Sequence, residues 1–92
     1  MSDEIQVHLK IVNEKGLHAR ASAKLVEVVE GFDAEATVMR EGLDASGDSI
    51  MGLLMLAASK GTTIEVRTSG PEAQALSQAL TDLVADRFGE DA

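Results

Sequence analysis

The hydrophobic period of the sequence changes abruptly within its first third, and few folds accommodate such a change. Apolar side chains alternate with polar ones from Ile5 to Ile11, which predicts a β-strand with one buried face. From Ala19 to about Glu30 the apolar residues recur at helical spacing, and Gly31 provides a stop signal. A strand followed so closely by an amphipathic helix indicates a sheet with a helix packed against it.

The rest of the chain continues this mixture of strands and helices. Further strands are predicted over residues 34–40, 43–45 and 62–68, with a tight turn at Glu41-Gly42. Further helices are predicted over residues 50–59 and after Pro71, the last with a buried stripe of Ala73, Leu76, Leu80, Leu83 and Val84. The order βαββαβα predicts an α+β fold: a two-layer open-faced sandwich with a four-stranded, largely antiparallel sheet and three helices on one face.

The chain is expected to end in a frayed tail. Residues 89–92 carry no apolar pattern, and we expect this segment to fray. The acidic residues near the C-terminus are expected to form a solvated face, and they are Asp82, Asp86, Glu90 and Asp91.

Length and composition exclude several classes of function. The 92 residues suit one domain, 1–92, that we expect to be a monomer, and without cysteine there is neither a disulfide nor a thiolate metal site. A formal charge of −8, with Phe32 and Phe88 as the only aromatic residues, argues against nucleic-acid binding.

We expect no metal ion and no cofactor, because metal-ligand spacings and the aromatic lining of a pocket are missing. With neither a membrane span nor a signal peptide in the sequence, we expect a cytoplasmic protein that does not insert into membranes.

His18 occupies an unusual position, at or next to the N-cap of the first helix. Ser, Thr, Asp or Asn would normally stand there, and departures of this kind tend to mark functional positions. The free N–H groups and the helix dipole, worth about half a positive charge, disfavour an imidazolium and favour an anion. We therefore expect a neutral, nucleophilic imidazole beside a site for a phosphoryl group.

The neighbours of His18 fit the same chemistry. Arg20 lies in the first helical turn and can donate to phosphate oxygens. Several small residues follow His18 and are expected to let a protein partner approach the ring: Ala19, Ala21, Ser22 and Ala23. The second histidine, His8, alternates with core residues on the first strand and is expected to be solvated and inactive.

The helix predicted over residues 50–59 is apolar around nearly its whole circumference. If Leu53, Leu56 and Ala57 face the core, an apolar group consisting of Ile50, Met51 and Leu54 lies near the surface as a docking patch. The alternative is a helix buried on most sides. At its start, Ser49 and Asp48 are both suitable N-cap residues.

Two motifs together resemble a known family. The segment Gly16-Leu17-His18-Ala19-Arg20 is followed by Asp48-Ser49-Ile50-Met51-Gly52 and a Lys60-Gly61 turn, and the sequence is similar to HPr from Val7 to Phe88. HPr is the histidine-containing phosphocarrier protein of the phosphoenolpyruvate-dependent phosphotransferase system. The resemblance implies a carrier, not an enzyme, that accepts a phosphoryl group from phospho-enzyme I and passes it to a IIA protein or domain in sugar transport and its regulation.

The resemblance also implies roles for individual residues. His18 matches the histidine phosphorylated on Nδ1, Arg20 the arginine that steadies the phosphoryl group, and Ser49 a serine that a kinase/phosphorylase modifies in many members. Partner docking is expected on the two helix starts, at Ala19, Ala23, Lys24, Ile50, Met51 and Leu54.

The sequence departs from the family pattern in the first helix. Ala21 stands where Pro is common, and Glu27 and Glu30 stand where several relatives have basic residues, which leaves Lys24 beside Arg20. Sugar and nitrogen branches share these motifs. The alternatives are a regulatory interaction module that is recognised through Ser49 and the second helix while His18 is idle, and a small ligand-binding domain that uses the open face of the sheet.

Overall fold

The alternating segments form one antiparallel sheet. The computed structural model describes residues 4–92, and residues 1–3 lie outside the described residues. The strands are β1 (Ile5–Lys10), β2 (Glu35–Arg40), β3 (Leu43–Ser46) and β4 (Thr63–Ser69), arranged in the order β1-β4-β2-β3. The last strand in sequence is therefore central in the sheet, between β1 and β2.

The register places the apolar residues of neighbouring strands opposite one another. Val66 of β4 pairs with Val7 of β1 on one side and with Val38 of β2 on the other. The β2–β3 hairpin closes at Glu41 and Gly42, whose φ angles of 49° and 80° are both left-handed. Two consecutive left-handed residues are the signature of the tight hairpin turn that the sequence predicts at this point.

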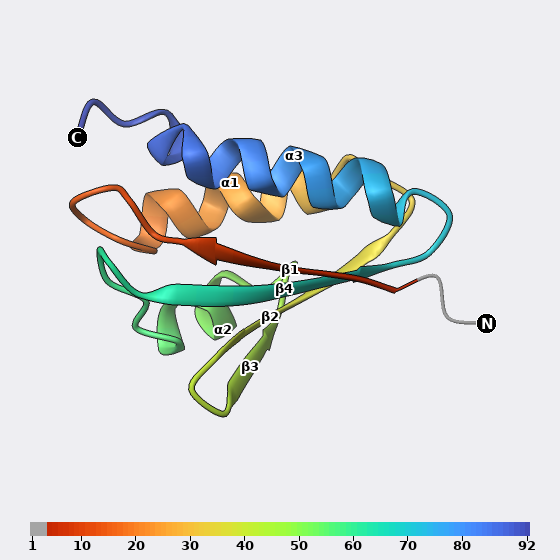
Figure 1. Ribbon diagram of the computed structural model, residues 1–92, viewed down its shortest axis with the longest axis horizontal. Helices are drawn as coiled ribbons and strands as arrows, with labels where there is room; N and C mark the ends of the chain where they lie inside the picture. The colour runs from red at the N-terminus through yellow and green to blue at the C-terminus, as the bar shows by residue number, and fades with distance from the viewer. Residues whose placement is uncertain (1–3) are drawn as a thin grey trace.

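The helices follow the predicted order. They are α1 (Ala19–Glu30), α2 (Ile50–Met55) and α3 (Ala73–Ala85), and a short 3₁₀ segment, η1 (Arg87–Gly89), follows α3. Figure 1 shows α1 and α3 side by side over the sheet, while α2 packs against α1 and β3. The βαββαβα sandwich with a four-stranded antiparallel sheet and three helices is confirmed. No helix within residues 4–92 is long and apolar enough to cross a membrane.

The core lies between the sheet and the helices. Its largest fully buried apolar side chains come from every layer: Phe88, Ile11, Leu25, Leu53, Leu56, Ile64, Leu76, Leu80, Val38 and Val66. Within the predicted stripe of α3, Leu83 is only half-buried, and the helix begins at Ala73, two residues after Pro71.

The second helix is shorter than predicted. It ends at Met55 because Ala57 adopts a left-handed φ of 51°, and the chain then turns so that Ala58 O accepts a hydrogen bond from Leu17 N at 2.9 Å. The expectation that Ala57 faces inward is wrong: Ala57 is exposed and Ala58 is buried instead. The residues after Met55 are thus used to hold the loop that precedes α1.

Candidate functional site

The loop before α1 is held tightly against the segment after α2. Gly16 has a φ of +64°, and a Cβ at this position would lie 2.5 Å from Ala58 O. Both the backbone conformation and the close approach require glycine. The next residue, Leu17, is buried and donates its N–H to Ala58 O. These contacts fix the position of the backbone just before His18.

His18 is the N-cap residue of α1, as the sequence predicts. Its backbone is extended (φ −78°, ψ −176°), its side chain makes no capping hydrogen bond, and its carbonyl accepts from Ser22 N at 2.8 Å. The first N–H groups of an α-helix have no partner within the helix, so an anion beside the ring can use them. The small residues are only partly available to a partner: Ala19 is exposed and Ala23 half-buried, but Ala21 and Ser22 are buried, contrary to expectation.

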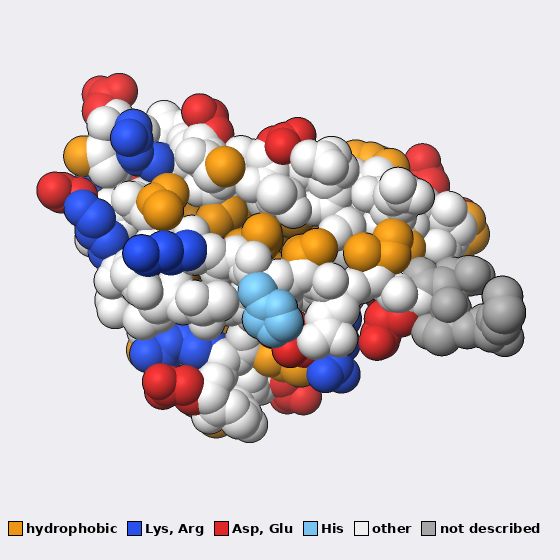
Figure 2. All heavy atoms as spheres, viewed as in Figure 1, with side chains coloured by type: hydrophobic (Ala, Val, Ile, Leu, Met, Phe, Trp, Pro, Cys, Tyr) orange, Lys and Arg blue, Asp and Glu red, His pale blue; other side chains and the backbone are white. Residues whose placement is uncertain are grey.

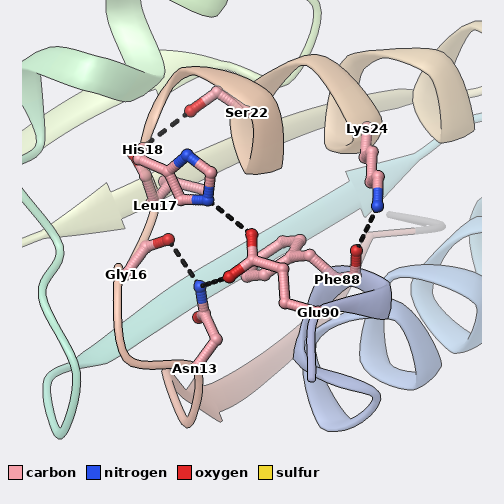
Figure 3. A network of polar contacts seen from close by, with 8 residues as sticks. All are labelled: Asn13, Gly16, Leu17, His18, Ser22, Lys24, Phe88 and Glu90. Carbon is pink, nitrogen blue, oxygen red and sulfur yellow. Dashed lines mark hydrogen bonds and ion pairs between the residues drawn. The ribbon is translucent and has the colours of Figure 1, made fainter. Parts of the chain in front are cut away.

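The His18 ring contacts a carboxylate from the other end of the chain. His18 Nε2 pairs with Glu90 Oε2, and Glu90 Oε1 accepts a hydrogen bond from Asn13 Nδ2 at 3.1 Å. Asn13 is fully buried and also donates to Gly16 O at 2.8 Å. Figure 3 shows Glu90 between Asn13 and the ring, with the second ring nitrogen directed away from Glu90, toward α1.

The C-terminal tail is therefore anchored, and the prediction that it frays is wrong. Lys24 Nζ donates to Phe88 O at 2.6 Å, and Glu14 N donates to Ala92 O at 3.2 Å. Glu90 does not belong to a solvated acidic face, since its side chain is only 15% exposed. The sequence did not predict that Asn13 and Glu90 belong to the site, because the two residues are 77 positions apart. The only local signal was a turn that contains Asn13 and Gly16.

A left-handed segment directs the tail toward His18. Arg87, Phe88 and Gly89 have φ angles of 55°, 54° and 78°. The two non-glycine residues are unfavourable in this region, at a cost of the order of 1–3 kcal/mol each. The Phe88 side chain, which is fully buried in the core, holds the segment in place. Burial of an aromatic ring can offset such a cost.

Cationic side chains lie beside His18 despite the acidic composition. A pocket of about 380 Å³ contains His18 and Glu90 and is also lined by Lys15, Arg20 and Lys24. Figure 2 shows Lys and Arg side chains gathered toward the left end, where the β1–α1 loop and the C-terminus lie in Figure 1. The hydrogen bond from His18, followed by that from Asn13, holds the pKa of Glu90 below its usual range. The site thus combines one accessible imidazole with these three cations and with three carboxylates, those of Glu14, Glu90 and Asp91.

Arg20 is available for a ligand. Its side chain is exposed, and its guanidinium makes no hydrogen bond or ion pair within the described part of the chain. Lys24, by contrast, already donates to the tail. Of the two cations that the sequence places on this helix, Arg20 is the one free to bind phosphate oxygens.

The surface of α2 matches the predicted apolar patch with one addition. Ile50, Met51 and Met55 are 39%, 71% and 75% exposed, whereas Leu54 is half-buried. The alternative of a helix buried on most sides is wrong. We call the exposed set Ile50, Met51 and Met55 the α2 patch. Met55 is an addition, because it was expected neither in the inward set nor in the surface set.

Ser49 begins α2 as its N-cap. Ser49 Oγ accepts a hydrogen bond from Gly52 N at 3.0 Å, so of the two possible caps the structure uses Ser49. Asp48 Oδ1 instead accepts from Ser46 Oγ at 2.6 Å. The serine hydroxyl therefore stands directly beside the α2 patch.

The open face of the sheet does not contribute to this site. His8 lies there, exposed as predicted, and its Nε2 pairs with Glu65 Oε1 at 3.2 Å. A pocket of about 400 Å³ on this face is lined by a mixture of charged and apolar residues, including His8, Met39, Glu65 and Arg67. Within residues 4–92, no group of three or more His, Asp or Glu side chains is arranged to hold a metal ion.

Comparison with known proteins agrees with this geometry. The family model described as the PTS HPr component phosphorylation site matches residues 5–86. The chain belongs to the HPr family. Among HPr proteins it is 44% identical over 86 residues to that of Cupriavidus necator, covering 94% of this chain and 97% of the relative. It is also 42% identical over 87 residues to that of Xylella fastidiosa Temecula1, covering 95% and 98%.

A phosphocarrier protein of another name and the solved structures of the family are similar as well. Phosphocarrier protein NPr of Escherichia coli K12 is 40% identical over 84 residues, covering 90% of this chain and 93% of that protein. The crystal structure of HPr-C-His from Thermoanaerobacter tengcongensis superposes with a TM-score of 0.90 at 31% identity, covering 96% and 99%. As an HPr family member, the chain is a phosphoryl carrier, not an enzyme, in the relay from enzyme I to a IIA protein or domain of the phosphotransferase system.

Proposed function

We propose that His18 is the phosphoryl-carrying residue and that the bond forms at Nδ1. The observation that carries this proposal is the ring's position at the N-cap of α1, with Nε2 paired to Glu90. Nδ1 is then the nitrogen left to react, on the side of the free N–H groups of the helix start. A phosphoryl group there meets donors already oriented toward it.

Arg20 supplies the second part of the proposed site. Its exposed guanidinium can donate to the phosphoryl oxygens and stabilise their charge during transfer, which is mainly a matter of positioning and electrostatics. A carrier must also release its phosphoryl group, so stabilisation by one arginine and helix amides suits a shuttle better than a tight site does.

Partner docking is proposed on the surface around the two helix starts. Ala19, Ala23 and Lys24 lie on α1, and Ile50, Met51 and Leu54 lie on α2, which packs against α1. Exposed methionine and aliphatic side chains adapt to partners of different shape, as a carrier that meets enzyme I and a IIA protein requires. We place this relay in the cytoplasm, with the protein acting as a monomer.

The direct test is incubation with phosphoenolpyruvate and enzyme I, with the sugar-branch and nitrogen-branch forms of enzyme I in separate reactions. Intact mass measurement should show one phosphoryl adduct that is labile in acid and stable in alkali. The adduct should be lost in His18→Ala and retained in His8→Ala. Failure of both forms of enzyme I to produce an adduct, or its persistence in His18→Ala, would contradict the proposal.

We further propose Ser49 as a site of regulatory phosphorylation by a serine kinase/phosphorylase. Its hydroxyl caps α2 beside the exposed Ile50 and Met51, so a phosphate there would lie at a helix start and within the docking surface. Incubation with ATP and an HPr-directed serine kinase should label the protein, and Ser49→Ala should abolish the label. Labelling that survives in Ser49→Ala would assign the modification to another residue.

A further inference from the structure

The tail after α3 is built to place one carboxylate on His18. The left-handed run of Arg87, Phe88 and Gly89 turns the chain back toward the β1–α1 loop, and the buried Phe88 ring fixes that turn. Backbone contacts on both sides of Glu90 hold the segment in place, through Lys24 Nζ to Phe88 O and Glu14 N to Ala92 O. An unfavourable backbone with this many anchors points to a function for the residue that it positions.

The Glu90 carboxylate is oriented by a second hydrogen bond, in addition to its contact with the His18 ring. Oε1 accepts from Asn13 Nδ2, and Oε2 faces His18 Nε2. Asn13 is fully buried and tied to Gly16 O, so it holds the carboxylate and the His18 loop in one arrangement. An ionised carboxylate only accepts hydrogen bonds, so its partner Nε2 must carry a proton. In the neutral ring the lone pair then lies on Nδ1.

We propose that Glu90 is a positioning residue for His18: it fixes the ring proton on Nε2 and thereby presents Nδ1 to the incoming phosphoryl group. This inference rests on the proposed role of His18 as the carrier residue. Glu90 does not touch the reacting phosphorus and acts only through the imidazole.

The same contact serves both directions of transfer. In acceptance, the Nδ1 lone pair forms the N–P bond while the bond between phosphorus and the donor breaks. The proton stays on Nε2, so the phosphorylated ring gains a positive charge that the Glu90 carboxylate offsets. In donation, the N–P bond breaks, a bond from phosphorus to the acceptor forms, and the ring returns to its neutral state. No proton has to leave or enter the ring in either step.

The other charged residues around His18 and Glu90 offer a matched control variant. Lys15, Arg20 and Lys24 line the pocket from the loop and α1, and Glu14 and Asp91 line it from the loop and the tail. Asp91 is exposed, and among the described residues Glu90 supplies the only carboxylate that pairs with the His18 ring. Asp91→Asn therefore removes the same unit of charge from the neighbouring residue without removing the ring contact.

The first measurement is ¹⁵N NMR of the His18 ring in the unphosphorylated full-length protein, near pH 8.5, where an ordinary imidazole is neutral. A fixed tautomer gives two widely separated nitrogen shifts, whereas exchange between tautomers averages them. We expect wide separation in the wild type and in Asp91→Asn, and a narrower separation in Glu90→Ala. The assigned shifts should identify Nε2 as the protonated nitrogen in the wild type.

The second measurement is the rate of phosphoryl acceptance from phospho-enzyme I. We expect Glu90→Ala to be about three- to ten-fold slower than the wild type, the range for loss of one ordinary hydrogen bond. Asp91→Asn should match the wild type. Thermal unfolding of each variant checks that the fold is retained.

The two measurements separate this inference from the proposed function. If the wild type accepts no phosphoryl group on His18, the proposed function fails, and the NMR comparison still tests the Glu90 contact. Wild-type nitrogen shifts in Glu90→Ala, or an acceptance rate in Glu90→Ala equal to that of the wild type, would overturn the positioning role. So would an equal loss of rate in Asp91→Asn, which would show a general charge effect.

Discussion

His18 receives a different environment at each of its two ring nitrogens. Nε2 meets a carboxylate from the tail, while the start of α1 offers unpaired N–H groups on the other side of the ring. The first environment requires a donor and the second accepts an anion. One imidazole can satisfy both only with its proton on Nε2.

Arg20→Ala should slow phosphoryl transfer while leaving the fold intact. The guanidinium is exposed, so its loss leaves no cavity, but the phosphoryl oxygens lose a charge-assisted hydrogen bond. We expect about a ten-fold lower rate in both directions, measured by rapid-quench transfer from phospho-enzyme I and to the IIA partner. Arg67→Ala, which removes an exposed arginine from the open face of the sheet, is the control. Equal rates for Arg20→Ala and the wild type would show that the helix amides suffice.

Gly16→Ala should be markedly more destabilising than Gly42→Ala. Both glycines have left-handed φ angles, of +64° and +80°, but a Cβ at Gly42 meets nothing within 4 Å. At Gly16 it would overlap Ala58 O, so the His18 loop must move. We expect a loss of about 1 kcal/mol for Gly42→Ala and about 3 kcal/mol or more for Gly16→Ala, measured by urea unfolding. Equal losses of stability in the two variants would mean that the His18 loop can move away from Ala58 without an energetic cost.

At the level of secondary structure, α2 combines a capping role with a surface role. Its buried side, including Leu53, joins the core, and its exposed side forms the α2 patch. Because the helix has only six residues, Ser49 at its start is next to both Ile50 and Met51. A charge added at Ser49 should therefore affect the proposed docking more directly than it affects packing.

Ser49→Asp should fold normally and accept phosphate from enzyme I more slowly. Asp is also a good N-cap, so the melting temperature should stay within about 5 °C of the wild type. The new charge would have to be desolvated when a partner covers the α2 patch. Gln74→Glu adds the same charge on an exposed position of α3 and serves as the control. Undiminished phosphorylation of Ser49→Asp would place the docking surface elsewhere, and loss of the fold would show that Ser49 is mainly structural.

On the scale of the whole molecule, charge is distributed unevenly. The chain carries a formal charge of −8, but three of its eight Lys and Arg residues, Lys15, Arg20 and Lys24, line the pocket beside His18. In that pocket they lie near the carboxylates of Glu14, Glu90 and Asp91. The net charge argued against nucleic acids as partners, but it did not predict the local electrostatic field at the site. That field depends on which few side chains the fold brings together.

The His18–Glu90 contact should make part of the free energy of unfolding dependent on pH. The pKa of Glu90 is lowered in the folded protein, mainly by the hydrogen bond from His18. Its stabilising contribution is therefore fully present above the unfolded carboxyl value of about 4.3 and is lost as the pH falls through the lower folded value.

The measurement is urea unfolding between neutral pH and about pH 3, a range that spans the ordinary Glu value. Glu90→Gln should be less stable than the wild type at neutral pH, and the difference should shrink as the pH falls. Asp91→Asn, with the same change of charge, should show no comparable convergence. A difference between Glu90→Gln and the wild type that stays constant with pH would show that the contact is not electrostatic in origin.

The sequence by itself determined the elements, their order and the position of His18 at the start of α1. These features depend on local periodicity and on turn residues such as Gly42, whose effects act within a few positions along the chain. The end of α2 was mispredicted because the contact between Leu17 N and Ala58 O, which lies beyond its last turn, is a tertiary one.

Only the tertiary structure decided what surrounds the imidazole. Asn13 and Glu90 have ordinary local contexts, and no periodicity links residues so far apart in the sequence. They meet because α3 packs along the sheet and the buried Phe88 turns the following residues back toward the β1–α1 loop. A candidate reactive residue can be found from local pattern, but the side chain that meets its second ring nitrogen is decided by the fold.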